Sequence, residues 1–135
     1  MPQMIFVNLP VKDLAKSMDF FKALGFSFNP QFSDETGACM VISDTIFAML
    51  LTHEKFAGFS PKPIADTEKT TEVLIALSRD DRAAVDAIVA AALAAGGSTF
   101  SEPQDHGFMY GRAFRDLDGH VWEAFWMDPA AAKAQ

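Results

Sequence analysis

The residue best suited to acid–base chemistry is His106, which lies in the segment Asp105-His106-Gly107 just before a predicted strand. A neutral imidazole accepts a proton near physiological pH, and a neighbouring carboxylate such as that of Asp105 could orient it. Tyr110 and Arg112 follow, and strand alternation places both side chains on one face. We therefore treat His106 and Tyr110 as candidate catalytic residues and Arg112 as a candidate ligand-binding residue. The alternative for His106 is a loop histidine that caps a turn.

The single cysteine, Cys39, lies in an apolar run where a buried thiol normally packs as a small hydrophobe. One cysteine cannot form an internal disulfide, so we expect a cytoplasmic protein. The sequence has no P-loop, HExxH, CxxC or GxGxxG pattern. Phosphate-cradling and zinc-protease functions therefore have no support.

Composition narrows the partners further. The 135 residues suit one domain, and the formal net charge of −7 argues against nucleic acid and against anionic membrane surfaces. Thirteen residues are Phe, beside two Trp and one Tyr. Aromatic side chains without polar atoms fill cores and line pockets for apolar or ring-bearing molecules. The expected partner is thus a small molecule.

The order strand, helix, strands occurs twice along the chain. The strand around Ile5–Leu9 precedes a helix that Asp13 caps and Gly25 ends. Later, Ser78 and Asp81 resemble a capping box before a second helix that Gly96-Gly97 closes. An offset of 66 aligns the first strands of the two halves and an offset of 74 aligns the last ones. An α+β domain without internal symmetry is the alternative.

We therefore predict one α+β domain over residues 1–135, with a first βαβββ module at 1–52 and a second at 71–128. Residues 53–70 are polar, contain two prolines and are predicted to link the modules. The Ala-rich tail, 129–135, is expected to be frayed.

Three segments of the chain resemble the vicinal-oxygen-chelate superfamily of glyoxalases, bleomycin resistance proteins and dioxygenases. They are residues 9–26, with Val-Lys-Asp-Leu before an aromatic helix ending in Leu-Gly; residues 96–112; and the turn and strand Asp116-Leu-Asp-Gly-His-Val-Trp-Glu123. The resemblance covers nearly the whole chain. It implies two paired βαβββ modules that form an incomplete barrel-like cleft, and it implies a homodimer.

Many members of that superfamily hold a divalent metal on four strand positions. The resemblance places these positions on Phe6, Met49, Glu72 and Glu123 in this sequence. Glu72 and Glu123 would then be metal ligands or catalytic carboxylates, and two ligands are replaced by apolar residues. A divalent metal is the only cofactor this implies. The dioxygenase pattern needs two His that are absent here.

The resemblance also turns the ligand-position face of each strand toward the cleft. The side chains that share this face by alternation are candidate ligand-binding residues: Phe6, Asn8, Phe47, Met49 and Phe125. Two carboxylates in such surroundings need a cation, a shared proton or a partner such as Arg112.

Two functions follow from this cleft. One is a glyoxalase-like enzyme of the lyase or isomerase type with an altered metal site. The other is a metal-free binding or resistance protein that sequesters a hydrophobic or aromatic molecule.

Overall fold

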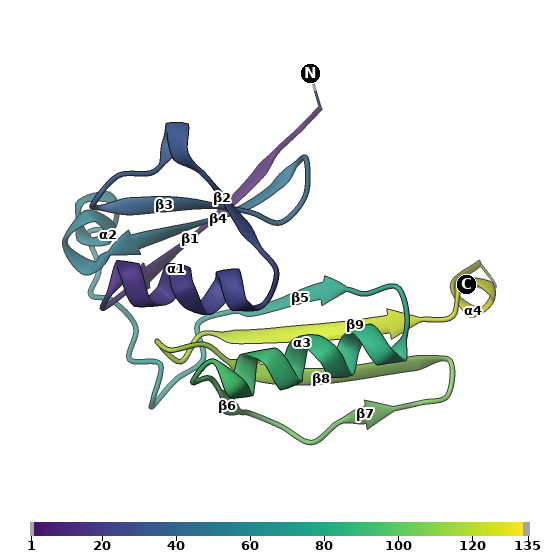
Figure 1. Ribbon diagram of the computed structural model, residues 1–135. Coiled ribbons are helices and arrows are strands. Elements are labelled where there is room, and N and C mark those ends of the chain that lie inside the picture. The colour runs from purple at the N-terminus through teal and green to yellow at the C-terminus, as the bar shows by residue number, and fades with distance from the viewer. Residues whose placement is uncertain (1, 134–135) are drawn as a thin grey trace. The chain divides into compact units, whose positions relative to one another are not determined.

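The structure is a computed structural model that describes residues 2–133. The chain divides into two compact units, Met1–Asp66 (unit 1) and Thr67–Gln135 (unit 2), and each has its own sheet (Figure 1). The predicted α+β class is confirmed, and the order strand, helix, strands occurs in both units, with one additional two-residue strand, Gln104–Asp105, in unit 2. The border falls at Thr67, inside the stretch predicted to link the modules.

Unit 1 is a four-stranded mixed sheet with the strand order β1-β4-β3-β2. Strands β1 and β4 are parallel, and the other neighbours are antiparallel. Its elements in chain order are β1 (Ile5–Val11), α1 (Leu14–Ala23), β2 (Ser27–Asn29), a 3-10 turn (Pro30–Phe32), β3 (Gly37–Val41), β4 (Ile46–Thr52) and α2 (His53–Phe59).

Helix α1 begins where the sequence predicts it. The side chain of Asp13 accepts a hydrogen bond from the backbone amide of Lys16 at 3.0 Å, which satisfies one free donor of the first turn. Gly25 follows the helix with φ of 103°, a conformation that glycine adopts without strain. The core of unit 1 consists of buried apolar side chains of α1 and the sheet, among them Leu9, Val11, Phe20, Phe21, Met40, Ala48 and Leu50.

Unit 2 has the sheet order β5-β9-β8-β6, and the short strand β7 also pairs with β8. Helix α3 lies along this sheet (Figure 1). The elements are β5 (Leu74–Ser78), α3 (Arg82–Ala94), β6 (Ser98–Thr99), β7 (Gln104–Asp105), β8 (Met109–Arg115), β9 (Val121–Met127) and α4 (Pro129–Lys133). The core is formed mainly by Val85, Ile88, Val89 and Ala92 of α3 against Phe114, Trp122 and Ala124 of the sheet.

The turn between β8 and β9 is built around one buried carboxylate, that of Asp116, which is 5% exposed. It accepts hydrogen bonds from the backbone amides of Asp118 and His120, at 2.9 and 3.1 Å, and from the indole nitrogen of Trp122 at 2.9 Å. Burial raises the pKa of the Asp116 carboxyl, and nearby His120 and these hydrogen bonds oppose that effect. Gly119 is required here, because a Cβ at its φ of 83° would lie 2.6 Å from Oγ1 of Thr67.

The two units follow one plan, but not with the predicted offset throughout. The offset of 74 between the last strands is confirmed by the turns that precede them. The Ile42 amide donates to the Ile46 carbonyl at 3.0 Å, and 74 residues later the Asp116 amide donates to the His120 carbonyl at the same distance. The first strands and helices align at 68 rather than 66, since the helix caps are Asp13 and Asp81.

Three local predictions need correction. Helix α3 is capped by Asp81 alone, whose side chain accepts from the Ala84 amide at 2.7 Å, so Ser78 is not its cap. The predicted linker, 53–70, begins with helix α2, because the Thr52 hydroxyl caps it by accepting from the Lys55 amide at 3.2 Å. In the tail, Pro129–Lys133 form helix α4, and residues 134 and 135 lie outside the described part.

Candidate functional site

Unit 2 contains a pocket of about 260 Å³ on its sheet. The floor is made by Met109, Gly111 and Ala113 of β8 with Glu123 and Phe125 of β9. Ser101, Glu102 and Gln104 form a wall from the segment that runs between β6 and β8. The floor is apolar apart from the Glu123 side chain, and small residues at 111 and 113 leave the space above it open.

Strand alternation places this pocket on the sheet face that is turned away from α3. Tyr110 and Arg112 both hydrogen-bond to Asp86 of α3, so the even-numbered residues of β8 point toward that helix. On β9, Trp122 is fully buried on the same side. Glu123 has the opposite parity and is half-buried in the pocket. We call this side of the unit 2 sheet the free face.

Glu123 is a carboxylate without a partner. Within residues 2–133, no side chain or backbone group forms a hydrogen bond or ion pair with it. Its cross-strand neighbour is Ala113, which contributes only a methyl group. Gly111 pairs with Phe125, and a Cβ at Gly111 would lie 3.6 Å from the Phe125 Cβ. A larger side chain at position 111 would therefore project into the pocket beside Glu123.

Glu72, the other predicted carboxylate, lies elsewhere in unit 2. Its Oε1 is 2.7 Å from Nδ1 of His120, a side chain that is only 2% exposed. His120 has the parity of Trp122, so its ring lies on the opposite side of β9 from Glu123. Glu72 does not line the pocket. Glu72 and Glu123, which were predicted to form a pair, therefore lie apart in unit 2.

Tyr110 and Arg112 were expected to reach the cleft, and the structure turns both toward α3. The Tyr110 hydroxyl donates to Oδ1 of Asp86 at 2.6 Å, and Nη1 of Arg112 lies 3.0 Å from the same oxygen. These two hydrogen bonds lower the pKa of Asp86, and the bond to Asp86 raises the pKa of Tyr110. Arg112 borders the pocket, but its guanidinium is engaged on the helix side.

His106 lies in the exposed turn between β7 and β8, outside the pocket lining. Its backbone amide donates to the Met109 carbonyl at 2.8 Å, and its ring lies 6.3 Å from that of Phe108. Asp105 was expected to orient this imidazole. Instead the Asp105 carboxylate binds Arg82, and its pKa falls to about 2 through that hydrogen bond and the bond from the Gly107 amide.

The candidate residues of unit 1 lie together on the side of its sheet opposite the buried Leu9 and Val11, and we call this side the free face of unit 1. Phe6 pairs with Phe47 across β1 and β4, and Asn8 pairs with Met49. The Phe6 and Phe47 rings are stacked with centroids 4.8 Å apart. Cys39 is buried beside Met49 in the sheet, and burial raises the pKa of its thiol, which makes it a poor nucleophile.

Comparisons with known proteins agree with this architecture. A family model described as bleomycin resistance protein-like N-terminal matches residues 3–43. A solved hypothetical protein from S. aureus is 34% identical, with 93% of this chain and 95% of that chain covered and a TM-score of 0.78. A glyoxalase/bleomycin resistance protein/dioxygenase family enzyme from Burkholderia phytofirmans is 19% identical, with 93% and 99% covered and a TM-score of 0.76. This chain has the fold of the glyoxalase/bleomycin resistance protein/dioxygenase structures.

Another structural neighbour is named as a fosfomycin resistance protein, from Listeria monocytogenes. It is 18% identical to this chain, with 93% of each chain covered and a TM-score of 0.65. At this identity it shows the fold alone. No curated protein sequence matches this chain significantly. Within residues 2–133, no helix is long and apolar enough to cross a membrane.

The metal positions of the superfamily do not fit a metal here. Because the first strands align at an offset of 68, the position equivalent to Phe6 in unit 2 is Leu74, not Glu72. The four positions are then Phe6, Met49, Leu74 and Glu123. These four residues supply one carboxylate in all, which is too few donors for a divalent ion. The described residues also hold no group of three His, Cys, Asp or Glu side chains suited to a metal.

The wall of the pocket was not predicted from the sequence. Ser101, Glu102 and Gln104 lie in an exposed segment without the periodicity that marks strands. Met109 could have been found, because alternation from Gly111 places it on the same face. On this strand the predicted site residues were Tyr110 and Arg112, because their side chains carry reactive or charged groups.

Proposed function

We propose that this protein binds a small apolar or aromatic molecule that carries a hydrogen-bond donor, in the unit 2 pocket and without a metal. The observation that carries this proposal is the half-buried Glu123 carboxylate, which has no partner among residues 2–133. Met109, Ala113 and Phe125 would contact the apolar body of the ligand. The Glu123 carboxylate would accept a hydrogen bond from the polar group of the ligand, preferably an ammonium group.

The physical reason is the cost of leaving an anion among apolar side chains. Transfer of a charged group out of water is unfavourable unless another group pairs with it. A bound ammonium would supply a charge-assisted hydrogen bond, and such bonds are about twice as strong as neutral ones. Exposed Glu102 at the pocket wall adds a second negative charge that favours a cation over an anion.

An enzyme of the glyoxalase-like lyase or isomerase type is the other function drawn from the sequence. It depended on Glu72 and Glu123 acting together, with His106 and Tyr110 assisting. In the structure Glu72 bonds His120, Tyr110 bonds Asp86, and His106 lies outside the pocket. The contacts of unit 2 therefore support the binding function over the catalytic one.

A charge series of ligands tests the proposal on the unmodified protein. Phenethylamine, phenethyl alcohol and hydrocinnamate share a phenyl ring and differ in the charge of the polar end. We expect phenethylamine to bind best, by roughly tenfold or more in Kd over the anion, since a charge-assisted bond is worth about 1.5–3 kcal/mol. Isothermal titration with and without a chelator measures both affinity and metal dependence. Equal affinity for all three ligands, or binding that a chelator abolishes, would contradict the proposal.

A homodimer, expected from the family resemblance, is also proposed here. Light scattering across a range of concentrations tests it, and a monomer at every concentration would contradict it.

A further inference from the structure

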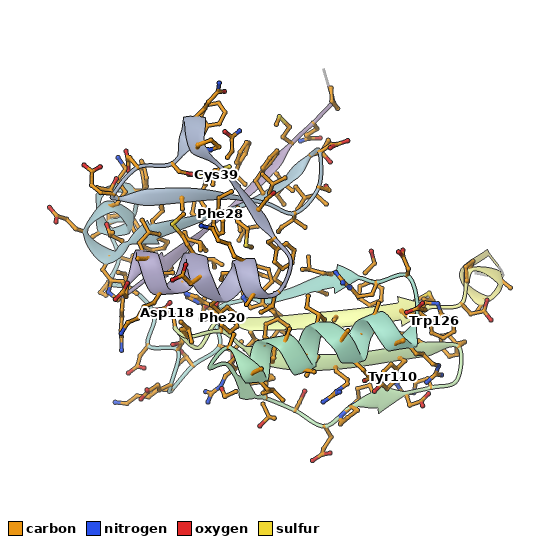
Figure 2. The ribbon with its side chains drawn as sticks, in the orientation of Figure 1. Phe20, Phe28, Cys39, Tyr110, Asp118 and Trp126 are labelled. Atoms are coloured by element: carbon orange, nitrogen blue, oxygen red, sulfur yellow. The ribbon has the colours of Figure 1, made fainter. Side chains whose placement is uncertain are left out.

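Arg82 joins helix α3 to strand β7 and to the turn that follows it. Arg82, the first residue of α3, donates to both carboxylate oxygens of Asp105, at 2.9 and 3.0 Å, and to the Gly107 carbonyl at 2.8 Å. Its guanidinium carbon lies 5.1 Å from the ring centroid of Tyr110 and 5.3 Å from that of Trp126. Figure 2 shows Tyr110 and Trp126 near the end of the unit 2 sheet where β7 leads into β8.

The two residues of β7 connect this arginine to the pocket. Gln104 and Asp105 are adjacent in a strand, so their side chains point to opposite sides. Asp105 faces Arg82 on the helix side, and Gln104 lines the pocket together with Ser101 and Glu102. Holding Asp105 in place therefore also fixes the direction of Gln104 and the position of the wall.

The segment 100–108 has few other attachments. All nine residues are exposed, including Phe100 and Phe108 at 46% and 43%. Strand β7 pairs with β8 through two residues only, and two further backbone bonds run from the His106 amide to the Met109 carbonyl and from the Asp128 amide to the Phe108 carbonyl. A segment with little buried apolar surface opens locally at a small free energy. The three hydrogen bonds from Arg82 are thus a large share of what keeps the wall closed.

We propose that Arg82 is a positioning residue that holds segment 100–108 as the pocket wall and thereby slows release of the ligand. The part that concerns ligand release rests on the function proposed above; the part that concerns the wall does not. The planar fork of arginine suits this role, because it binds a carboxylate through two parallel bonds and stacks on aromatic rings. A lysine at this position would keep the charge but lose the fork.

A second pair in unit 2 supplies a matched control. Arg112 and Asp86 also join α3 to β8, with 3.0 Å between Nη1 and Oδ1. This pair forms no bond to segment 100–108. Asp86→Asn and Asp105→Asn therefore remove the same charge from two neighbouring arginine pairs, and only the second one loosens the wall.

Hydrogen exchange of the ligand-free protein tests the wall directly. We expect amides of segment 100–108 to exchange about three- to tenfold faster in Arg82→Lys and in Asp105→Asn, as loss of an exposed paired arginine allows. Asp86→Asn should leave this segment unchanged. The double variant Arg82→Asp with Asp105→Arg should restore part of the protection. Exchange in Arg82→Lys that equals the wild type, or that rises equally in Asp86→Asn, would overturn the proposal.

The dissociation rate of phenethylamine tests the link to ligand release. We expect Arg82→Lys to raise this rate about three- to tenfold, while Asp86→Asn keeps the wild-type rate. A wild-type protein that does not bind phenethylamine would count against the proposed function, and the exchange result would still decide the role of Arg82. A faster-exchanging wall with an unchanged dissociation rate would overturn the link between them.

Discussion

The two units have the same strand order and differ in what their sheets carry. In unit 1 the free face holds the stacked rings of Phe6 and Phe47. In unit 2 the equivalent face holds the pocket with Glu123, whose counterpart in unit 1 at the offset of 74 is Met49. The same backbone plan thus carries an apolar surface in one unit and an unpartnered carboxylate in the other.

The turns before the last strands differ in the same way. In unit 2 the buried Asp116 carboxylate accepts hydrogen bonds from two backbone amides of its turn and from the indole nitrogen of Trp122. The equivalent residues of unit 1 are Ile42 and Ala48, so that turn is held by backbone bonds and by a hydrogen bond of 3.4 Å from the Thr45 amide to the Ser43 hydroxyl. Polar groups are therefore concentrated in unit 2, both in its core and in its pocket.

The largest expected effect concerns the buried hydrogen bond between Trp122 and Asp116. Trp122→Ala should lower the free energy of unfolding by about 3–5 kcal/mol, because Trp122 is fully buried and its loss leaves a cavity and an unpaired Asp116 oxygen. Chemical denaturation measures the change. Phe47→Ala in unit 1 is the comparison, and it should cost less, since no buried polar atom loses a partner. A smaller effect for Trp122→Ala than for Phe47→Ala would contradict the distinction between the units.

A smaller effect is expected from the second carboxylate of unit 2. Glu72→Gln should lower the free energy of unfolding by about 1 kcal/mol, because it replaces a charge-assisted bond to buried His120 with a neutral one. Thermal and urea unfolding measure it, and Glu35→Gln, at an exposed position of unit 1, is the control. Equal stability of the two variants would show that Glu72 has no structural role.

The ring stack of unit 1 should contribute less still. Phe6 is 47% exposed, so Phe6→Ala should cost only about 0.5–1.5 kcal/mol, mainly from the lost ring contact with Phe47. Urea unfolding of this variant, with Phe6→Leu as the control that keeps apolar volume, measures it. A loss as large as that of Trp122→Ala would mean that Phe6 belongs to the core.

The smallest expected effect is a change in the pH at which Asp105 titrates. The pKa of Asp105 is lowered from its ordinary 3.8 to about 2 by Arg82. A lowered pKa means that the stabilising contribution is present above pH 3.8 and is lost as the pH falls through about 2. Carboxyl chemical shifts followed by NMR should show this midpoint in the wild type and one nearer 3.8 in Arg82→Lys. Identical midpoints would contradict the pairing.

Much of the fold followed from the sequence because each element has a local signal. Asp13 and Gly25 mark the ends of α1, and the turn at Asp116–Gly119 marks the last two strands. The predicted offset of 66 between the first strands of the two units was wrong. Those strands share almost no sequence identity, so only the helix caps fix the alignment. That error moved the third ligand position from Leu74 to Glu72.

The site was predicted only in part for a related reason. Strand periodicity groups Tyr110 with Arg112 and separates Glu123 from His120, but it does not say which group faces the helix. The hydrogen bonds to Asp86 of α3 show that Tyr110 and Arg112 face the helix, and Asp86 lies 24 residues from Tyr110 in the chain. The wall at 101–104 has no periodic signal and became visible only in the structure.

Binding of phenethylamine to two matched variants is the most direct test of the proposed function. Glu123→Gln and Glu72→Gln remove the same charge from unit 2, and only the first alters the pocket. We predict that Kd, measured by isothermal titration, rises about tenfold or more in Glu123→Gln and stays within about twofold of wild type in Glu72→Gln. Unchanged affinity in Glu123→Gln, or an equal loss in both variants, would contradict a ligand site built on Glu123.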